Sequence, residues 1–270
     1  MKITFIGGGN MANAIIGGLV RDGFDAAAVA VVEPLDAARA QLAQKSGVRA
    51  VAAIDQLNVL GDVVVLAVKP QQMREAIRPL AGRLGEATVL SIAAGLRAAD
   101  LARWLGGHAR IVRCMPNTPA LIGAGITAAC APAAVDAAGR AAVERILRAI
   151  GSVVWVDDEG LLDAVTAVSG SGPAYVFYFM EALRDAGRAL GLSAETAAQL
   201  TLETVLGAAK LASGSSEDVG VLRERVTSKG GTTEAALKSM AADGVKEAIA
   251  RAVKAANDRG QVLGAELGKD

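Results

Sequence analysis

The segment that most constrains the fold is a glycine-rich turn near the start of the chain. Residues 3–6 are apolar and have the length of a short buried strand, and Gly7, Gly8 and Gly9 follow directly. The next apolar residues recur at helical spacing, at Ala12, Ile15, Ile16, Leu19 and Val20. A strand, a glycine turn and a helix in this order open a strand–helix–strand unit, so the pattern favours an α/β fold.

Later segments repeat the character of residues 3–6. They are short, continuous apolar runs separated by helical segments, at residues 28–32, 63–68, 88–92 and 110–114. Continuous apolar strands that alternate with helices are typical of a parallel sheet covered on both faces. A helix at 133–150 and a strand at 152–156 complete this pattern. We therefore expect a doubly wound domain over residues 1–158.

The glycine turn has the form G-x-G-x-x-A, which alone is a weak signal. Here it follows a strand, opens a helix and precedes an acidic residue, Glu33, at the end of the second strand. In that setting the pattern is the fingerprint of a dinucleotide-binding Rossmann domain. Gly7 makes the tight turn, Gly9 leaves room for a pyrophosphate, and Ala12 lets the helix pack closely. The alternative is a doubly wound domain that binds no dinucleotide.

Small or polar residues follow three later strands. They are Lys69, residues 93–95, and Asn117 with Thr118. Ligands of open α/β sheets lie outside the carboxyl ends of the strands, so these residues are candidates for cofactor contact. For Lys69, a solvated loop position before Pro70 is an equally good interpretation.

The chain from residue 161 onward is helical, because no segment there alternates with period two. The acidic turn 157–160 marks the boundary, and we interpret it as a solvated turn before a helix. A long helix starts near Pro173, and Ala-rich helices follow at 193–213 and 244–265. Half of the aromatic residues cluster on the first helix, at Tyr175, Phe177, Tyr178 and Phe179. Side chains pointing in several directions predict burial by another subunit. We expect an all-helical dimerisation domain over residues 159–270.

A second glycine-rich segment lies inside this helical region. Gly230 and Gly231 precede two hydroxyl residues, Thr232 and Thr233, and an apolar helical pattern follows. The free N–H groups of such a helix start suit a small anion such as a carboxylate. The alternative is an ordinary glycine turn with a threonine cap.

Composition excludes several classes of protein. Lys+Arg and Asp+Glu both number 28, so net charge does not favour nucleic acid or an anionic membrane as partner. No apolar run approaches the roughly 18 residues of a membrane span. The first residues lack the pattern of a signal peptide, so we expect a cytoplasmic protein.

No standard catalytic set or cluster of metal ligands appears in the sequence. Cys114 and Cys130 lack C-x-x-C spacing, which argues against a zinc site or a disulfide framework, and no metal site is expected. His108, the only histidine, lies in a predicted surface loop. Reduction of a protonated cyclic imine needs only a hydride donor and a positioned acceptor, and is compatible with this set.

The motifs together resemble those of the pyrroline-5-carboxylate reductases. The resemblance covers essentially the whole chain and is carried by residues 5–12, 66–70, 93–95, 113–119, 169–175 and 226–233. It implies an oxidoreductase of proline biosynthesis that reduces 1-pyrroline-5-carboxylate to L-proline with NADPH or NADH. It also implies a homodimer formed through the C-terminal helices, which the family often assembles further into a decamer.

The resemblance assigns roles residue by residue. The positions matching cofactor contacts are Gly7, Gly8, Gly9, Asn10, Met11, Val68, Lys69, Ala94 and Asn117. The positions matching the loop that holds the substrate carboxylate are Gly230, Gly231, Thr232 and Thr233. Thr233 matches the hydroxyl that bonds the ring nitrogen, and Ser228 lies on the same pocket wall; we expect both in the catalytic site.

Glu33 departs from the family pattern. Many members carry Ser, Asn or Thr there, which suits a 2′-phosphate, whereas a carboxylate bonds a 2′-hydroxyl and repels a phosphate. Glu33 is thus a cofactor-binding candidate that favours NADH, unless Arg39 compensates. The alternatives are another imine or hydroxyacid reductase with the same two domains and a non-enzymatic dinucleotide-binding sensor or scaffold. β-Hydroxyacid dehydrogenases use a lysine on the first long helix of the second domain, and residues 173–190 contain none. A dinucleotide-binding sensor has no need of the second anion site.

Overall fold

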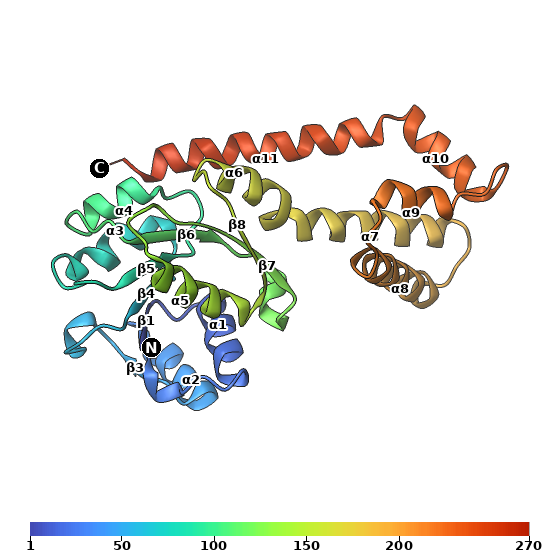
Figure 1. Cartoon of the computed structure of the whole chain (residues 1–270). Helices are drawn as coiled ribbons and strands as arrows, with labels where there is room; N and C mark the ends of the chain where they lie inside the picture. Colours follow the sequence, from blue (N-terminus) through green and yellow to red (C-terminus); the bar gives the residue numbers. More distant parts are fainter. Residues whose placement is uncertain (270) are drawn as a thin grey trace. The chain divides into compact units, whose positions relative to one another are not determined.

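The structure is a computed structural model that describes residues 1–269. Its backbone divides into two compact units (Figure 1). The first unit comprises residues 1–171 together with the described residues from 256 on, and the second comprises residues 172–255. The expected domain boundary at 158/159 stays a prediction, since a division by backbone contacts falls at 171/172 and returns the end of the chain to the first unit.

Within residues 1–269, the first unit is built on one eight-stranded sheet with the order β3-β2-β1-β4-β5-β6-β7-β8. The strands are β1 (Ile3–Ile6), β2 (Val29–Val32), β3 (Arg49–Val51), β4 (Val63–Leu66), β5 (Thr88–Ser91), β6 (Ile111–Met115), β7 (Gly125–Cys130) and β8 (Gly151–Trp155). The order runs outward from β1 in both directions, which confirms the doubly wound Rossmann-type sheet. The expected parallel sheet is confirmed for β1 to β6. Strand β7, which was not predicted, runs antiparallel to β6.

Helices cover both faces of this sheet. They are α1 (Asn10–Arg21), α2 (Asp36–Ser46), α3 (Pro70–Ile77), α4 (Ala98–Trp104), α5 (Ala137–Arg148) and α6 (Leu161–Val165). Ile15 and Ile16 of α1 pack with α5 against one face, whereas Met73 and Ile77 of α3 pack with α4 against the other. Each such side chain contributes roughly 1.5–3 kcal/mol by leaving water. The two clusters hold the carboxyl ends of the parallel strands β1, β2, β4, β5 and β6 on one common edge.

The second unit is helical. It contains α7 (Gly172–Ala189), α8 (Ala194–Ser213), α9 (Val219–Arg225), α10 (Thr232–Ala242) and the first part of α11 (Val245–Leu267). The hydroxyl oxygen of Ser193 caps α8 by accepting a hydrogen bond from the Thr196 amide at 3.1 Å. The helices expected at 173–190, 193–213 and 244–265 are therefore confirmed.

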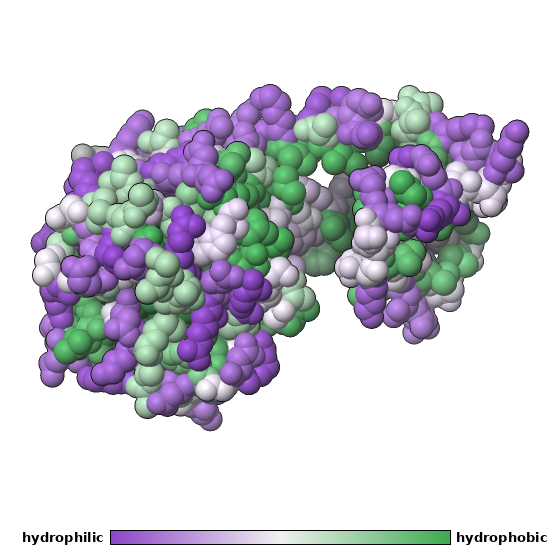
Figure 2. Space-filling model, in the orientation of Figure 1, coloured by the Kyte–Doolittle hydropathy of each residue, from purple (hydrophilic) through white to green (hydrophobic). Residues whose placement is uncertain are grey.

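Little of the second unit is buried within the chain. In residues 172–255, Ala197 is the one fully buried apolar residue, while apolar side chains are exposed along α7 and α8. Figure 2 shows hydrophobic residues at the surface of these helices. An isolated unit with so little core is unstable in water, so these faces need a further partner. Among residues 1–269, no helix is long and apolar enough to span a membrane.

Candidate cofactor and substrate sites

The three glycines of the turn between β1 and α1 differ in the space around their α-carbons. Gly7 has φ of +98°, and a Cβ there would lie 2.8 Å from the Ala67 carbonyl oxygen. A Cβ on Gly8 would lie 2.5 Å from Leu42. A Cβ on Gly9, by contrast, would meet no atom within 4 Å. The space beside Gly9 is thus open, and a ligand backbone or phosphate would fit there without a clash.

Helix α1 begins at Asn10 and has Gly9 as its N-cap, with no side chain bonded to its first amides in the part of the chain that the structure describes. Amides at the start of a helix attract anions, because their N–H groups are unpaired and the helix dipole is positive there. Gly9, Asn10 and Met11 therefore form a cradle that fits a pyrophosphate. Ala12 is fully buried, which lets α1 lie close to the sheet.

Glu33 lies directly beside this turn, at the end of β2. Its two carboxylate oxygens accept hydrogen bonds from the Gly8 amide at 2.9 Å and from the Leu35 amide at 3.0 Å. The Arg39 guanidinium donates to the backbone oxygens of Glu33 and Pro34 at 2.9 and 2.7 Å and pairs with Asp36. Both charges therefore stand at the position where a Rossmann domain receives the adenosine ribose.

The remaining cofactor candidates follow β4, β5 and β6 on the same edge. Val68 packs beside Gly7, Lys69 is the exposed N-cap of α3, and Ala94 is exposed after β5. Both polar atoms of the Asn117 side chain are hydrogen-bonded within the protein. Its Nδ2 donates to the Ser169 backbone oxygen at 3.2 Å, and its Oδ1 accepts from the Ile126 amide at 3.0 Å. The structure thus brings all ten cofactor candidates to one edge of the sheet.

The substrate-loop candidates lie together in the second unit. Gly230 has φ of +74°, and the Gly231 amide donates to the Ser228 oxygen at 3.0 Å. The N-cap of α10 is Gly231, without a side-chain cap, rather than a threonine. Thr232 and Thr233 are instead the first two residues of the helix, so its first amides and the Thr233 hydroxyl lie at one helix start. This arrangement fits a small carboxylate.

Glu234 holds this loop and was not predicted. Its carboxylate accepts from the Gly230 amide at 2.5 Å and pairs with Lys238 at 3.0 Å. The hydrogen bond from the Gly230 amide, and to a smaller extent the one from Lys238, lowers the pKa of the Glu234 carboxyl below its usual value. The sequence signal was a glutamate at the third position of a helix, where it reaches back to an amide before the helix.

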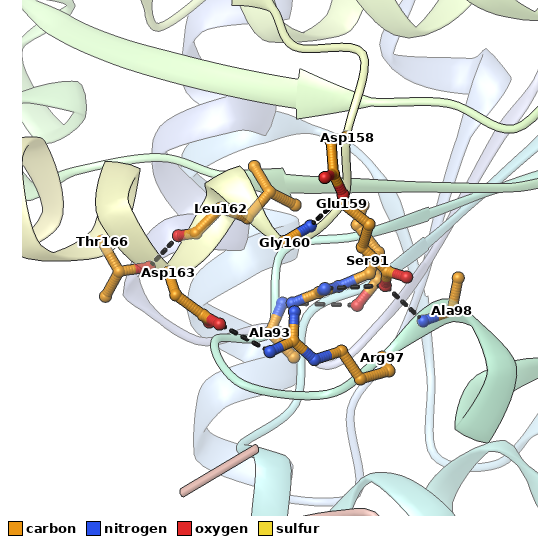
Figure 3. A network of polar contacts seen from close by, with 11 residues as sticks. Ser91, Ala93, Arg97, Ala98, Asp158, Glu159, Gly160, Leu162, Asp163 and Thr166 are labelled. Atoms are coloured by element: carbon orange, nitrogen blue, oxygen red, sulfur yellow. Dashed lines mark hydrogen bonds and ion pairs between the residues drawn. The ribbon is translucent and has the colours of Figure 1, made fainter. Parts of the chain in front are cut away.

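The acidic turn 157–160 is more than the solvated turn that we expected. Glu159 accepts hydrogen bonds from the Ala98 amide at 2.6 Å and from the guanidinium of buried Arg113 at 2.7 Å. Asp163, which is buried, pairs with Arg97 at 2.5 Å. Figure 3 shows Arg97 pointing to Asp163, and Glu159 beside Ala98. The interpretation as a solvated turn was wrong for Glu159, because a buried arginine on β6 requires a carboxylate partner.

The remaining reactive side chains do not form a second catalytic set. Cys114 and Cys130 are free thiols, and burial raises the pKa of both. His108 is half-buried, with its Nε2 at 2.9 Å from the Ala87 carbonyl oxygen. In residues 1–269, no group of three or more His, Cys, Asp or Glu side chains is placed to hold a metal ion.

Comparisons with known proteins cover both units. Residues 159–263 match the family model for pyrroline-5-carboxylate reductase dimerisation, and residues 2–95 match the model described as NADP oxidoreductase, coenzyme F420-dependent. A pyrroline-5-carboxylate reductase of Pseudomonas aeruginosa is 47% identical over 269 residues, or 99% of this chain and 98% of the relative.

Solved structures agree with the sequence relatives. A pyrroline-5-carboxylate reductase from Coxiella burnetii superposes with a TM-score of 0.93 at 42% identity, covering 97% of this chain and 98% of the other. A Plasmodium falciparum pyrroline carboxylate reductase with NADP bound gives a TM-score of 0.85 at 29% identity, covering 98% of each chain.

The fold, the cradle beside Gly9 and these matches define an NAD(P)H-dependent oxidoreductase with a Rossmann domain and a helical dimerisation domain. Its full-length relatives narrow the class to one enzyme family. The chain belongs to the pyrroline-5-carboxylate reductases.

Proposed function

We propose that this protein reduces 1-pyrroline-5-carboxylate to L-proline with NADPH or NADH, the last step of proline biosynthesis. A bound NADPH or NADH would supply the hydride that adds to the imine carbon and would be left oxidised, while the ring nitrogen ends with one proton. The observation that carries the proposal is the pair of anion-binding helix starts, one after Gly9 and one after Gly231. A reductase needs one for the cofactor pyrophosphate and one for the substrate carboxylate.

The first unit binds the cofactor, which supplies the hydride. The amides of Gly9, Asn10 and Met11 bind the pyrophosphate, and Glu33 binds the ribose hydroxyls of the adenosine half. Val68, Lys69, Ala94 and Asn117 line the path of the nicotinamide half, and Gly7 and Gly8 shape the turn. Because the Glu33 carboxylate is fixed by two amides, it cannot leave readily to make room for a 2′-phosphate, and NADH is favoured.

The second unit binds and orients the imine. The amides at Gly231, Thr232 and Thr233 hold the carboxylate, and Gly230 gives the loop its shape. The Thr233 hydroxyl bonds the ring nitrogen. A threonine hydroxyl is too weak an acid to be the sole proton source, so its part is orientation and charge stabilisation. Ser228 forms the adjoining wall.

The dimer is the unit of this function, and we propose that the dimers assemble further into a decamer in the cytoplasm. The exposed apolar faces of α7 and α8 support pairing between two copies. We also propose a functional boundary at residue 158/159, since the dimerisation match begins at residue 159.

The experiment is cofactor oxidation by the purified protein with 1-pyrroline-5-carboxylate as the acceptor. NADH and NADPH are compared at equal concentration, and L-proline is identified as the product. We expect proline-forming turnover with both cofactors and a higher kcat/KM with NADH. Binding of both cofactors without turnover on the imine would instead favour a sensor, and overturn the proposal.

A further inference from the structure

The loop between β5 and α4 lies at the cofactor edge of the sheet and contains Ala94. It turns at Gly95, whose φ is +82°. Buried Ser91 ends β5, and its hydroxyl lies 3.4 Å from the Ala93 amide. A mobile loop at this place would leave the nicotinamide half of the cofactor without a defined wall. The contacts that fix residues 93–97 therefore matter for the reaction.

Two acidic residues from a distant part of the sequence hold the end of this loop. Asp163 of α6 is 6% exposed and pairs with Arg97 at 2.5 Å. Glu159, just before α6, accepts the first amide of α4, that of Ala98, at 2.6 Å. Figure 3 shows both contacts, with Asp163 next to Arg97 and Glu159 next to Ala98. The same Oε1 of Glu159 accepts from Arg113, which fixes Glu159 in turn.

A third contact comes from the end of α11, within the same unit. A Cβ on Gly264 would lie only 2.8 Å from the Gly95 carbonyl oxygen, so the helix backbone and the loop backbone are in close contact. The loop is thus fixed at Gly95, at Arg97 and at Ala98, while Ala94 stays exposed. On the other side of Ala94, the Ala93 amide lies 3.4 Å from the Ser91 hydroxyl. Ala94 is therefore held before and after in the chain, which presents its backbone to a ligand.

We propose that Asp163 and Glu159 are positioning residues that hold the loop 93–97 in the shape that receives the nicotinamide half of the cofactor. Neither touches the cofactor; Asp163 acts through Arg97, and Glu159 through the amide of Ala98. The inference rests on the proposed function, since it takes the cofactor to lie along Ala94. A misplacement of about 1 Å at a reacting centre costs up to about 100-fold in rate, so a loosened loop should be visible in the kinetics.

The test compares Arg97→Met with Arg97→Lys. Methionine keeps the length of the side chain and loses the ion pair, whereas lysine keeps the charge and one donor. We expect Arg97→Met to lower kcat/KM for NADH about 10- to 100-fold, and Arg97→Lys to retain most of it. Binding of ADP, which occupies only the adenine half beside Glu33, should stay unchanged in both. Arg148→Met, which removes an exposed ion pair on α5, is the matched control.

A double variant separates positioning from stability. Removing one partner of a buried pair leaves an unpaired charge, whereas removing both is often neutral for stability. Arg97→Met with Asp163→Met should therefore recover the Tm of the wild type but not its kcat/KM for NADH. If activity returns together with the Tm, the pair serves the fold alone and the proposal is wrong.

Failure of the proposed function gives a different result. A wild-type protein without turnover on 1-pyrroline-5-carboxylate would overturn the function itself. An active wild type in which Arg97→Met keeps its kcat/KM for NADH would overturn only the positioning role.

Discussion

At the scale of single residues, Gly9 differs from its neighbours because the space beside its α-carbon is open. Its φ of −70° suits any residue, so Gly9→Val should fold. The added methyl groups fill the place of the pyrophosphate, and we expect NADH binding to be lost with the Tm unchanged. Fluorescence titration measures this binding. Gly17→Ala is the control. A Cβ on Gly17 also meets no atom within 4 Å, but this residue lies further along α1, so the variant should bind NADH normally.

Glu33 sets the cofactor preference by charge. Glu33→Ser removes the carboxylate beside Gly8 and should raise the affinity for NADPH relative to NADH, because repulsion of the 2′-phosphate disappears. Glu33→Gln keeps the shape and should shift the ratio in the same direction. The ratio of kcat/KM for the two cofactors is the measurement. A wild type that already prefers NADPH strongly would show that Arg39 dominates.

Thr233 contributes a single hydroxyl to the proposed chemistry. Thr233→Val retains the shape of the side chain and should lower kcat by roughly 10- to 1000-fold, since one oriented hydrogen bond is lost from the transition state. The affinity for NADH should not change. Ser228→Ala should mainly raise the KM for the imine. Full kcat in Thr233→Val would mean that the loop acts through its amides alone.

At the scale of elements, the start of α10 depends on Glu234. Because bonding to Gly230 and Lys238 lowers the folded pKa of this carboxyl, its stabilising contribution is complete above the ordinary glutamate pKa and is lost as pH falls through the lowered value. We expect Glu234→Gln to raise the KM for the imine with little effect on the KM for NADH. The wild-type KM should rise in the same way at acid pH, and a flat profile in steady-state kinetics would contradict this role.

The elements also show where sequence patterns are sufficient. The strand after Lys2, the glycine turn and α1 were predictable, because a buried strand and an amphipathic helix have clear periods. Strand β7 was missed, because Gly125–Cys130 combines a glycine and two alanines instead of forming a continuous β-branched run, and its antiparallel partner is fixed only by tertiary packing. Glu159 was misjudged for a related reason: its partners Ala98 and Arg113 are far away in the sequence.

At the scale of the whole molecule, each unit has its own energetic character. The first unit buries two continuous apolar clusters on the faces of its sheet. Residues 172–255 instead leave many large apolar side chains in contact with solvent. The aromatic cluster of α7 predicted this, since its members point in several directions. No pattern in one chain, however, specifies which faces of two copies meet, because the contact depends on complementary shape.

The last prediction concerns that contact. Phe177 and Tyr178 are 63% and 76% exposed in the single chain, which is unfavourable for large apolar side chains unless a second copy covers them. We expect light scattering to give at least a dimer at micromolar concentration. The double variant Phe177→Ser with Tyr178→Ser should shift the protein toward monomer and lower its Tm, because burial of each such side chain contributes about 1.5–3 kcal/mol. Leu35→Ser, at a side chain that is 68% exposed on the first unit, is the control and should remain assembled. A monomeric wild type, or equal assembly in both variants, would show that α7 is not part of the interface.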